Sequence, residues 1–363
     1  MNEIYLTIFF ICLLLFLLGS GVWVALSMIA VSAIGMILFT TRPVGDAMAT
    51  TIWGTSSSWS LTALPLFVWM GEILFRTKLS ENLFKGLSPW LSKLPGGLIH
   101  VNVIGCALFA AISGSSAATV ATVGKMSIPE LRKRKYPEKL LLGSLAGSGT
   151  LGLLIPPSII LIIYGVTIED SIAKLFMAGI FPGIMIALIF MSYVVIWSII
   201  NKNLMPKIKE NLSLSKKIKQ SKQLLPVIIL IISVIGSIYT GVATATEAAS
   251  LGVVGALFLS FFQGTLNLKT FELSLLGATK TSCMIAFILA GSTFLSLAMG
   301  FTGLPRNLAV WIKEMNLSPY TLIFVLTIFY IILGMFLDGI SAVVLTMAII
   351  EPMIRQAGFD MIW

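Results

Sequence analysis

Hydrophobic residues run along this chain in long stretches that are separated by short polar segments. A hydrocarbon core about 30 Å thick needs about 20 apolar residues in an α-helix, whereas the strands of a membrane barrel alternate with a period of two. The pattern predicts helices in eight apolar segments, which are residues 4–19, 21–40, 59–76, 140–165, 173–200, 224–243, 247–264 and 281–301. We therefore predict an all-α polytopic membrane protein.

Composition and charge agree with this prediction. Of the 363 residues, 57% are hydrophobic and 11% are charged, against about 25% charged residues in a soluble domain. A net charge of +9 would indicate nucleic acid as the partner of a soluble protein. Here the basic residues gather at 131–139 and 201–223, which marks these segments as cytoplasmic loops. The expected partner is thus the lipid bilayer and not nucleic acid, and the N-terminus is expected outside.

This topology leaves few basic residues on the outer side. With both basic segments inside, five of the 24 Lys and Arg residues remain outside, namely Arg42, Lys174, Arg306, Lys313 and Arg355. Enzyme activity is not expected, because His100 is the single histidine and no nucleophile–base pair or metal cluster is evident.

The segment 98–128 does not fit as a simple span, because the basic segments before and after it both belong inside. Each limb has about 13–15 residues, or about 20–22 Å of helix, which reaches only the middle of the membrane. We predict a re-entrant hairpin whose tip is formed by small and hydroxyl residues, Ser113, Gly114, Ser115 and Ser116. The alternative is that these small residues only allow close helix packing.

The next segment, 140–165, is predicted to be a broken helix. Its apolar sequence is interrupted by Gly147, Ser148, Gly149 and Thr150 and then by Pro156 and Pro157. Proline lacks the N–H donor and clashes with the preceding turn, so the helix cannot continue through the pair.

An internal repeat at an offset of 225 residues relates the two halves. LSENL (79–83) corresponds to LPRNL (304–308), segment 21–40 to 246–265, and Gly114, Ser116 and Ala117 to Gly339, Ser341 and Ala342. The halves begin on opposite sides of the membrane, which is the inverted-topology repeat of secondary transporters. We predict a first repeat at 1–200, a basic linker at 201–223 and a second repeat at 224–363.

The second repeat is expected to contain its own hairpin at 319–354, with a tip at 336–341. Counterparts of the broken helix and last span of the first repeat would fall near 364–425, so the second repeat is expected to be incomplete and the chain truncated at its C-terminus. The matched amphipathic segments 79–95 and 304–316 are predicted to be interfacial helices that link scaffold and hairpins.

Four segments together resemble the large membrane subunit of the tripartite ATP-independent periplasmic (TRAP) transporters. They are ISGSSAATVATVGKMSIPEL (112–131), GSGTLGLLIPPSIILIIYGV (147–166), TGVATATEAASLGVVGAL (240–257) and GMFLDGISAVVLT (334–346). The resemblance covers nearly the whole chain. It implies an elevator-type, sodium-driven uptake system for small organic acids in a bacterial inner membrane. The implied partners are a small four-helix membrane subunit and a periplasmic substrate-binding protein.

The resemblance also implies Na⁺ sites at the hairpin tips and helix breaks, where backbone carbonyls serve as ligands. Carried over by motif, the first site comprises Ser113, Gly114, Ser115, Ser116, Gly147, Ser148, Gly149, Thr150 and Ile155. The second comprises Asp338, Gly339 and Ser341, whose partner stretch lies outside this sequence. Residues expected near the substrate are Ser116, Thr119, Pro156, Asp338 and Arg42.

Several charged residues have a structural alternative. Asp338 is expected either to bind ion or substrate or to cap the hairpin turn, and Arg42 either to meet the anion or to lie at the membrane interface. Glu72 is expected to pair with Arg76, and Glu247 to cap a helix near the outer face or contact the transport path.

Two other functions remain open at this point. One is an organic-anion symporter or antiporter of related fold, coupled to Na⁺ or H⁺, that needs no binding protein. The other is a non-transporting membrane assembly subunit. A requirement for a soluble binding protein separates the first from the TRAP interpretation, and Na⁺-dependent thermal stabilisation would count against the second.

Overall fold

The computed structural model describes residues 3–77, 79–206, 213–303, 318–335 and 337–363. All regular secondary structure in these residues is helical, which confirms the all-α class, while the repeat and its three segments remain predictions. The chain divides into two compact units. Unit 1 comprises Met1–Leu61, Ile163–Asp170 and Ser282–Trp363, and unit 2 comprises Thr62–Ile162 and Ser171–Thr281.

The longest helices have the length and composition of membrane spans. Among the described residues, α10 (Ile172–Ile200), α13 (Ala245–Phe262) and α14 (Leu268–Thr302) are long and apolar enough to cross a membrane. The number of candidate spans rises to six if each of three bent helix pairs counts as one span. The chain is therefore an integral membrane protein by the length and composition of its helices.

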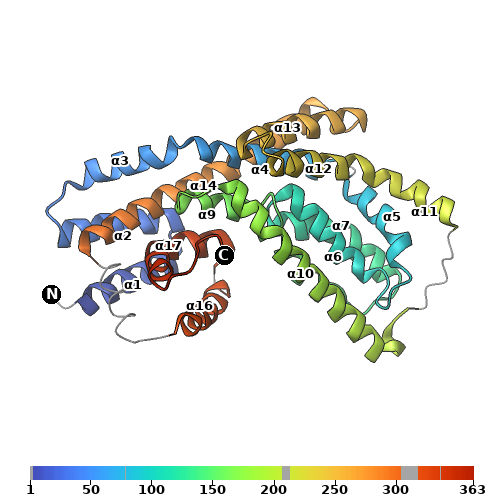
Figure 1. Cartoon of the computed structure of the whole chain (residues 1–363), viewed down its shortest axis with the longest axis horizontal. Coiled ribbons are helices and arrows are strands. Elements are labelled where there is room, and N and C mark those ends of the chain that lie inside the picture. Colours follow the sequence, from blue (N-terminus) through green and yellow to red (C-terminus); the bar gives the residue numbers. More distant parts are fainter. Residues whose placement is uncertain (1–2, 78, 207–212, 304–317, 336) are drawn as a thin grey trace. The chain divides into compact units, whose positions relative to one another are not determined.

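Unit 1 contains the three N-terminal helices, the end of α14, a short segment at Ile163–Asp170 and the last two helices (Figure 1). The N-terminal helices are α1 (Glu3–Gly19), α2 (Val24–Phe39) and α3 (Val44–Ser56), and the last two are α16 (Pro319–Gly334) and α17 (Gly339–Gln356). Met36, Phe294 and Ala298 form a buried cluster where α2 meets α14. Helix α3 lies outside every segment predicted as a helix, and Asp46 in its first turn interacts favourably with the helix dipole.

Unit 2 is built around a helical hairpin. Helices α6 (Ile99–Ser113) and α7 (Ser116–Lys133) are its two limbs, and both pack against α8 (Glu138–Gly149) (Figure 1). The first of the two predicted interfacial segments, 79–95, contains the amphipathic helix α5 (Leu79–Leu91), and this helix packs against α6 and α7. The second, 304–316, lies outside the described residues.

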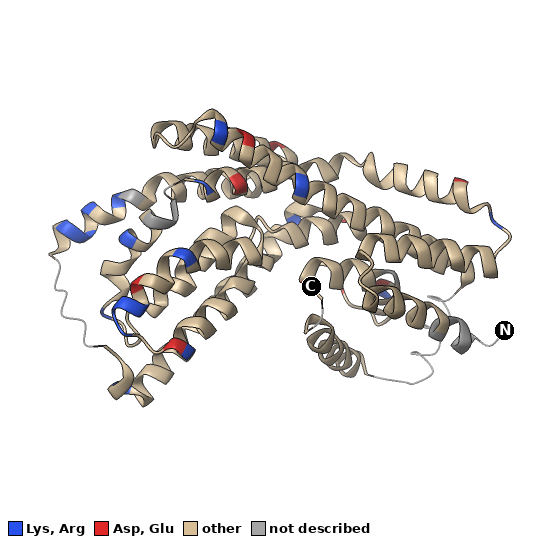
Figure 2. Ribbon diagram, turned by 180° about the vertical axis from the view of Figure 1, so that it is seen from behind, with Lys and Arg blue, Asp and Glu red and all other residues tan. Residues whose placement is uncertain are grey.

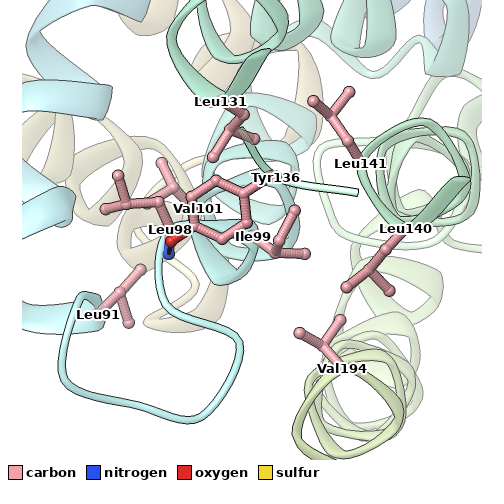
Figure 3. Packing of buried hydrophobic residues seen from close by; sticks show 9 residues of the cluster. All are labelled: Leu91, Leu98, Ile99, Val101, Leu131, Tyr136, Leu140, Leu141 and Val194. Atoms are coloured by element: carbon pink, nitrogen blue, oxygen red, sulfur yellow. Dashed lines mark hydrogen bonds between the residues drawn. The ribbon is translucent and has the colours of Figure 1, made fainter. Parts of the chain in front are cut away.

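A buried apolar cluster closes the open end of the hairpin (Figure 3). It comprises Leu91, Leu98, Ile99, Val101, Leu131, Tyr136, Leu140, Leu141 and Val194. The Tyr136 ring lies in the middle of this cluster, and its hydroxyl accepts a hydrogen bond of 3.0 Å from the Leu98 amide. The loop between α7 and α8 is thereby fixed to the beginning of α6.

Two further helices of unit 2, α4 (Ala63–Phe75) and α10, pack against the hairpin limb α6. The 3₁₀ turn η1 (Trp59–Thr62), whose last residue is the first of unit 2, leads into α4, and α4 packs mainly against α13. Helix α12 (Leu225–Tyr239) packs against α13. The predicted linker 201–223 contains η3 (Lys202–Leu204), helix α11 (Leu214–Ser221) and the beginning of η4 (Lys222–Leu224).

Candidate functional site

The predicted hairpin tip is a tight turn between two helices. Helix α6 ends at Gly114, whose φ of +58° is a left-handed conformation that glycine adopts without a steric penalty. Ser115 is the N-cap of α7, and its hydroxyl accepts a hydrogen bond from the Ala118 amide. The hydroxyls of Ser113 and Thr119 are bonded to each other at 2.9 Å, so Thr119 is buried behind the turn.

The predicted broken helix is also present. Helix α8 passes into the 3₁₀ turn η2 (Thr150–Leu153), the chain leaves helical geometry at 154–158, and α9 (Ile159–Thr167) begins directly after the double proline. The Ser158 hydroxyl donates to the Leu153 carbonyl at 2.7 Å across the break. The interruption is thus an ordered local structure, as the proline pair predicts.

The tip of the hairpin sits on this break through backbone atoms. The Ile159 amide donates to the Gly114 carbonyl at 3.4 Å. A Cβ at Gly114 would lie 3.0 Å from the Ile159 nitrogen, and one at Gly152 would lie 3.1 Å from the Ser116 nitrogen. The predicted hairpin tip and the predicted helix break are therefore in contact, with backbone packed directly against backbone.

Helix α10 supports the other side of the break. Gly179 and Gly183 are four residues apart, so they lie on one face of α10. A Cβ at Gly179 would lie 2.8 Å from the Leu154 carbonyl oxygen, and one at Gly183 would lie 2.7 Å from Ile155 Cγ1. The break is held between the hairpin tip and the glycine face of α10.

A pocket of about 350 Å³ opens beside the tip within unit 2. It is lined by one face of α4, by the tip residues Ser113 and Ser115, by Ile159 and by Thr281 of α14. Glu72 also lines it, and its carboxylate pairs with Arg76 at 2.8 Å, which confirms the predicted ion pair. Arg76 also donates to the Leu273 carbonyl at 3.1 Å, so the pair connects α4 to α14.

The predicted ligand residues 147–150, at the junction of α8 and η2, do not all face the tip. Gly149 faces it, because a Cβ there would meet Val120 of α7, and so does Gly152 of η2, whose Cβ would meet the Ser115–Ser116 peptide. Gly147 instead faces Phe190 of α10. The hydroxyls of Thr150 and Ser148 both donate back to α8 carbonyls, at 2.6 Å and 2.5 Å.

In unit 1, Asp338 is the N-cap of α17. Its Oδ2 accepts hydrogen bonds from the amides of Ile340 and Ser341 at 3.1 Å and 3.2 Å, which matches the capping alternative. Gly339 is the first residue of α17, and Ser341 is buried. The tip of this hairpin thus has an aspartate cap where the first has Ser115.

Two further charged residues have structural partners. The Arg42 guanidinium lies 5.3 Å from the centroid of the Phe301 ring, a cation–π distance. Glu247 forms a capping box at the start of α13, accepting from the amide and hydroxyl of Thr244, both at 2.8 Å.

The chain is similar to known proteins over most of its length. The sequence model of a family described as the DctM component of the tripartite ATP-independent periplasmic transporters matches residues 10–363. A C4-dicarboxylate TRAP transporter large permease protein of Pseudomonas aeruginosa is 33% identical over 330 residues, which are 90% of this chain and 76% of that protein.

Two other relatives match over a similar extent. A C4-dicarboxylate TRAP transporter large permease protein of Rhodobacter capsulatus is 30% identical over 98% of this chain and 83% of that protein. A sialic acid TRAP transporter large permease protein of Vibrio cholerae is 30% identical over 95% of this chain and 80% of its own length.

Proposed function

The chain belongs to the DctM component family of the tripartite ATP-independent periplasmic transporters, and on that premise we propose that it drives Na⁺-coupled, binding-protein-dependent uptake of small organic acids. It is a permease subunit rather than an enzyme. The substrate class rests on the relatives, whose names specify C4-dicarboxylates and sialic acid. The proposed location is a bacterial inner membrane with the N-terminus in the periplasm.

The observation that carries the Na⁺ proposal is the contact between hairpin tip and helix break. Na⁺ is a hard cation that needs oxygen ligands in place of its hydration shell, and a helix break exposes carbonyls that no longer accept i→i−4 bonds. The tip and the break supply such backbone oxygens from two elements at one place, at Gly114 and along 154–158. Ser113, Ser115 and Ser116 add hydroxyl oxygens around the tip.

The directions in which the residues of the broken helix point indicate which of their atoms would bind Na⁺ in the proposed first site. Gly149 and Gly152 face the tip, so ligands from the broken helix would come from this face and from Ile155. The hydroxyls of Ser148 and Thr150 are engaged with α8 carbonyls, so these two residues would contribute backbone rather than side-chain oxygens. Asp338, Gly339 and Ser341 remain the proposed second site, with Asp338 acting there through its cap.

For the substrate we propose the pocket beside the tip. Its hydroxyl lining from Ser113, Ser115 and Thr281 suits the hydroxyl and carboxyl groups of small organic acids. Ser116, Thr119 and Pro156 lie at the tip and break next to it, whereas Arg42 and Asp338 belong to unit 1. A small membrane subunit and a periplasmic substrate-binding protein complete the proposed system, and an elevator-type movement of the hairpins and broken helices would carry the substrate.

Uptake into proteoliposomes tests this proposal. The chain is reconstituted with its genomically neighbouring small subunit, and a panel of labelled carboxylates is offered with and without binding protein and an inward Na⁺ gradient. We expect uptake of at least one carboxylate only when both are present. Uptake that needs no binding protein would instead favour the binding-protein-independent transporter. A complete lack of Na⁺ response in both transport and thermal stability would contradict Na⁺ coupling.

A pair of matched variants tests the role of the tip. Thr119→Val removes the hydroxyl that is bonded to Ser113 and keeps the shape of the side chain. Thr122→Val makes the same change at a buried residue three positions further along α7, whose hydroxyl donates to the Ala118 carbonyl of its own helix. We expect a weaker apparent Na⁺ affinity for Thr119→Val only. Equal Na⁺ affinity in the two variants would contradict a Na⁺ site at the tip.

A further inference from the structure

Helix α11 is oriented with a lysine inward and its apolar residues outward. Lys217 is only 7% exposed, whereas Leu214 is 70% and Ile218 is 53% exposed. Leu214 and Ile218 are four residues apart, so they form one apolar strip along the helix. A helix that faced water would be expected to have the opposite orientation.

Specific contacts with α5 fix this orientation. The Lys217 ammonium lies 5.5 Å from the centroid of the Trp90 ring, a cation–π distance. Trp90 Nε1 donates to the Ser221 hydroxyl at 2.7 Å, and that hydroxyl in turn donates to the Gly86 carbonyl at 3.3 Å. Lys217 and Ser221, four residues apart, are therefore the face of α11 that is bound to α5.

Positive charge borders the apolar strip. At 100° per residue, Lys222, Lys219 and Lys216 follow Leu214 and Ile218 around the outer side, and all three are exposed. Figure 2 shows basic residues along α11 and around the neighbouring helix ends of unit 2. Trp90, half exposed on α5, adds an amphipathic ring beside them.

From this arrangement we propose that α11 and the adjacent edge of α5 lie on the membrane surface and bind anionic phospholipid headgroups. Leu214 and Ile218 insert at the boundary between headgroups and acyl chains, and Lys216, Lys219 and Lys222 attract the phosphates. Burying Lys217 on Trp90 leaves the apolar strip free for the bilayer. The inference requires that the chain is embedded in a membrane, and it does not depend on the transported solute.

Site-specific fluorescence in vesicles tests the insertion. The native Cys12, Cys106 and Cys283 are replaced by alanine, and a new cysteine at Leu214 is labelled with the environment-sensitive dye NBD. The control places the dye at Ser213, the exposed N-cap residue of α11, which lies 100° or more around the helix from Leu214 and Ile218 and is not among the proposed lipid contacts. Both proteins are reconstituted in vesicles of a neutral host lipid. One set of vesicles also contains brominated phosphatidylcholine, and the other contains the same mole fraction of brominated phosphatidylglycerol, which is anionic.

We expect a blue-shifted emission at position 214 relative to position 213, and about twofold or greater quenching at 214 by the anionic than by the neutral brominated lipid. Emission at 214 that matches 213 and is quenched by aqueous iodide would overturn the proposal. Shielding of position 214 that appears only after a partner subunit is added, and is equal in all lipids, would also overturn it in favour of a protein interface.

Charge reversal tests the role of the lysines. In K216E/K219E/K222E the preference for the anionic lipid at position 214 should be lost, while Lys217 and its contact with Trp90 remain. The matched control K125E/K133E/K139E makes the same change of charge at exposed lysines of α7 and α8 and should keep the preference. Equal loss in both triple variants would show a general charge effect and contradict a specific site on α11.

Discussion

Replacing Gly114 by alanine tests how closely the hairpin tip is bound to the helix break. At φ +58° an L-residue is strained by about 1–2 kcal/mol. The new Cβ would also lie 3.0 Å from the Ile159 nitrogen and 3.1 Å from the Pro157 carbonyl oxygen. Both are backbone atoms that cannot rotate away, so the tip must move off the break.

That movement weakens the hydrogen bond between the Ile159 amide and the Gly114 carbonyl, which contributes about 0.5–1.5 kcal/mol. Against these losses, alanine lowers the conformational entropy of the unfolded chain, which stabilises by about 0.4–1 kcal/mol. The free energy of unfolding should therefore fall by about 0.5–3 kcal/mol in total.

Gly143→Ala is the matched control. Gly143 lies within α8, and no atom lies within 4 Å of the Cβ that the substitution would add. Alanine is favoured over glycine in a helix by about 1 kcal/mol, so this variant should be as stable as the wild type or more stable. The same substitution is thus expected to act in opposite directions at the two positions.

The assay is thermal unfolding of the purified protein, followed by intrinsic fluorescence in NaCl and in KCl. We expect Gly114→Ala to have a lower Tm and a smaller difference between the two salts than Gly143→Ala. If both variants show the same Tm and the same response to Na⁺, the close contact between tip and break does not stabilise the protein and the reasoning is refuted.

Three further variants probe packing and charge in unit 2. Tyr136→Phe leaves the buried Leu98 amide without its acceptor, so the free energy of unfolding measured by chemical denaturation should fall by about 1–3 kcal/mol. A fall of less than about 0.5 kcal/mol would show that another acceptor replaces the hydroxyl. Gly179→Ala places a Cβ 2.8 Å from a carbonyl oxygen of the break, so Tm and uptake should both fall, unlike in Gly236→Ala, where the added atom meets open space. The hydrogen bond from Arg132 lowers the pKa of the exposed Glu138 carboxyl in the folded protein. The ion pair therefore adds to folding stability at any pH above the ordinary glutamate pKa, and this stability is lost as the pH falls through the lowered pKa of Glu138. The Tm difference between wild type and Glu138→Gln should accordingly be small, constant near neutral pH and absent in acid, and a difference that grows in acid would contradict this assignment.

The sequence predicted the hairpin and the break because both depend on local chemistry. A Gly–Ser turn between two half-length apolar limbs and a double proline in an apolar stretch allow few conformations, and α6, α7, η2 and α9 follow them. The contact between Gly114 and Ile159 was anticipated only as a pairing of motifs. Its backbone-to-backbone closeness depends on tertiary packing, which residue types do not encode directly.

Other features escaped prediction for identifiable reasons. Helix α3 has many small and polar residues, so its hydrophobic pattern does not stand out from a loop. Helix α11 is short and rich in lysine, and only its packing on Trp90 makes it a defined element. Asp338 shows the reverse case, because an aspartate before Gly-Ile-Ser at the start of an apolar helix is a recognisable N-cap signal, which the structure supports.

The tip and the break meet through backbone atoms, and this affects how the protein can diversify. The contacts at Gly114 and Gly152 depend on the absence of a side chain, not on the identity of the side chains around them. Substitutions at the neighbouring exposed Ala117 and Ala121, which line the pocket, can therefore change its shape and polarity without separating the two elements. Under the proposed function, single replacements at these two positions would alter the solute preference and leave the proposed Na⁺ site at the tip intact.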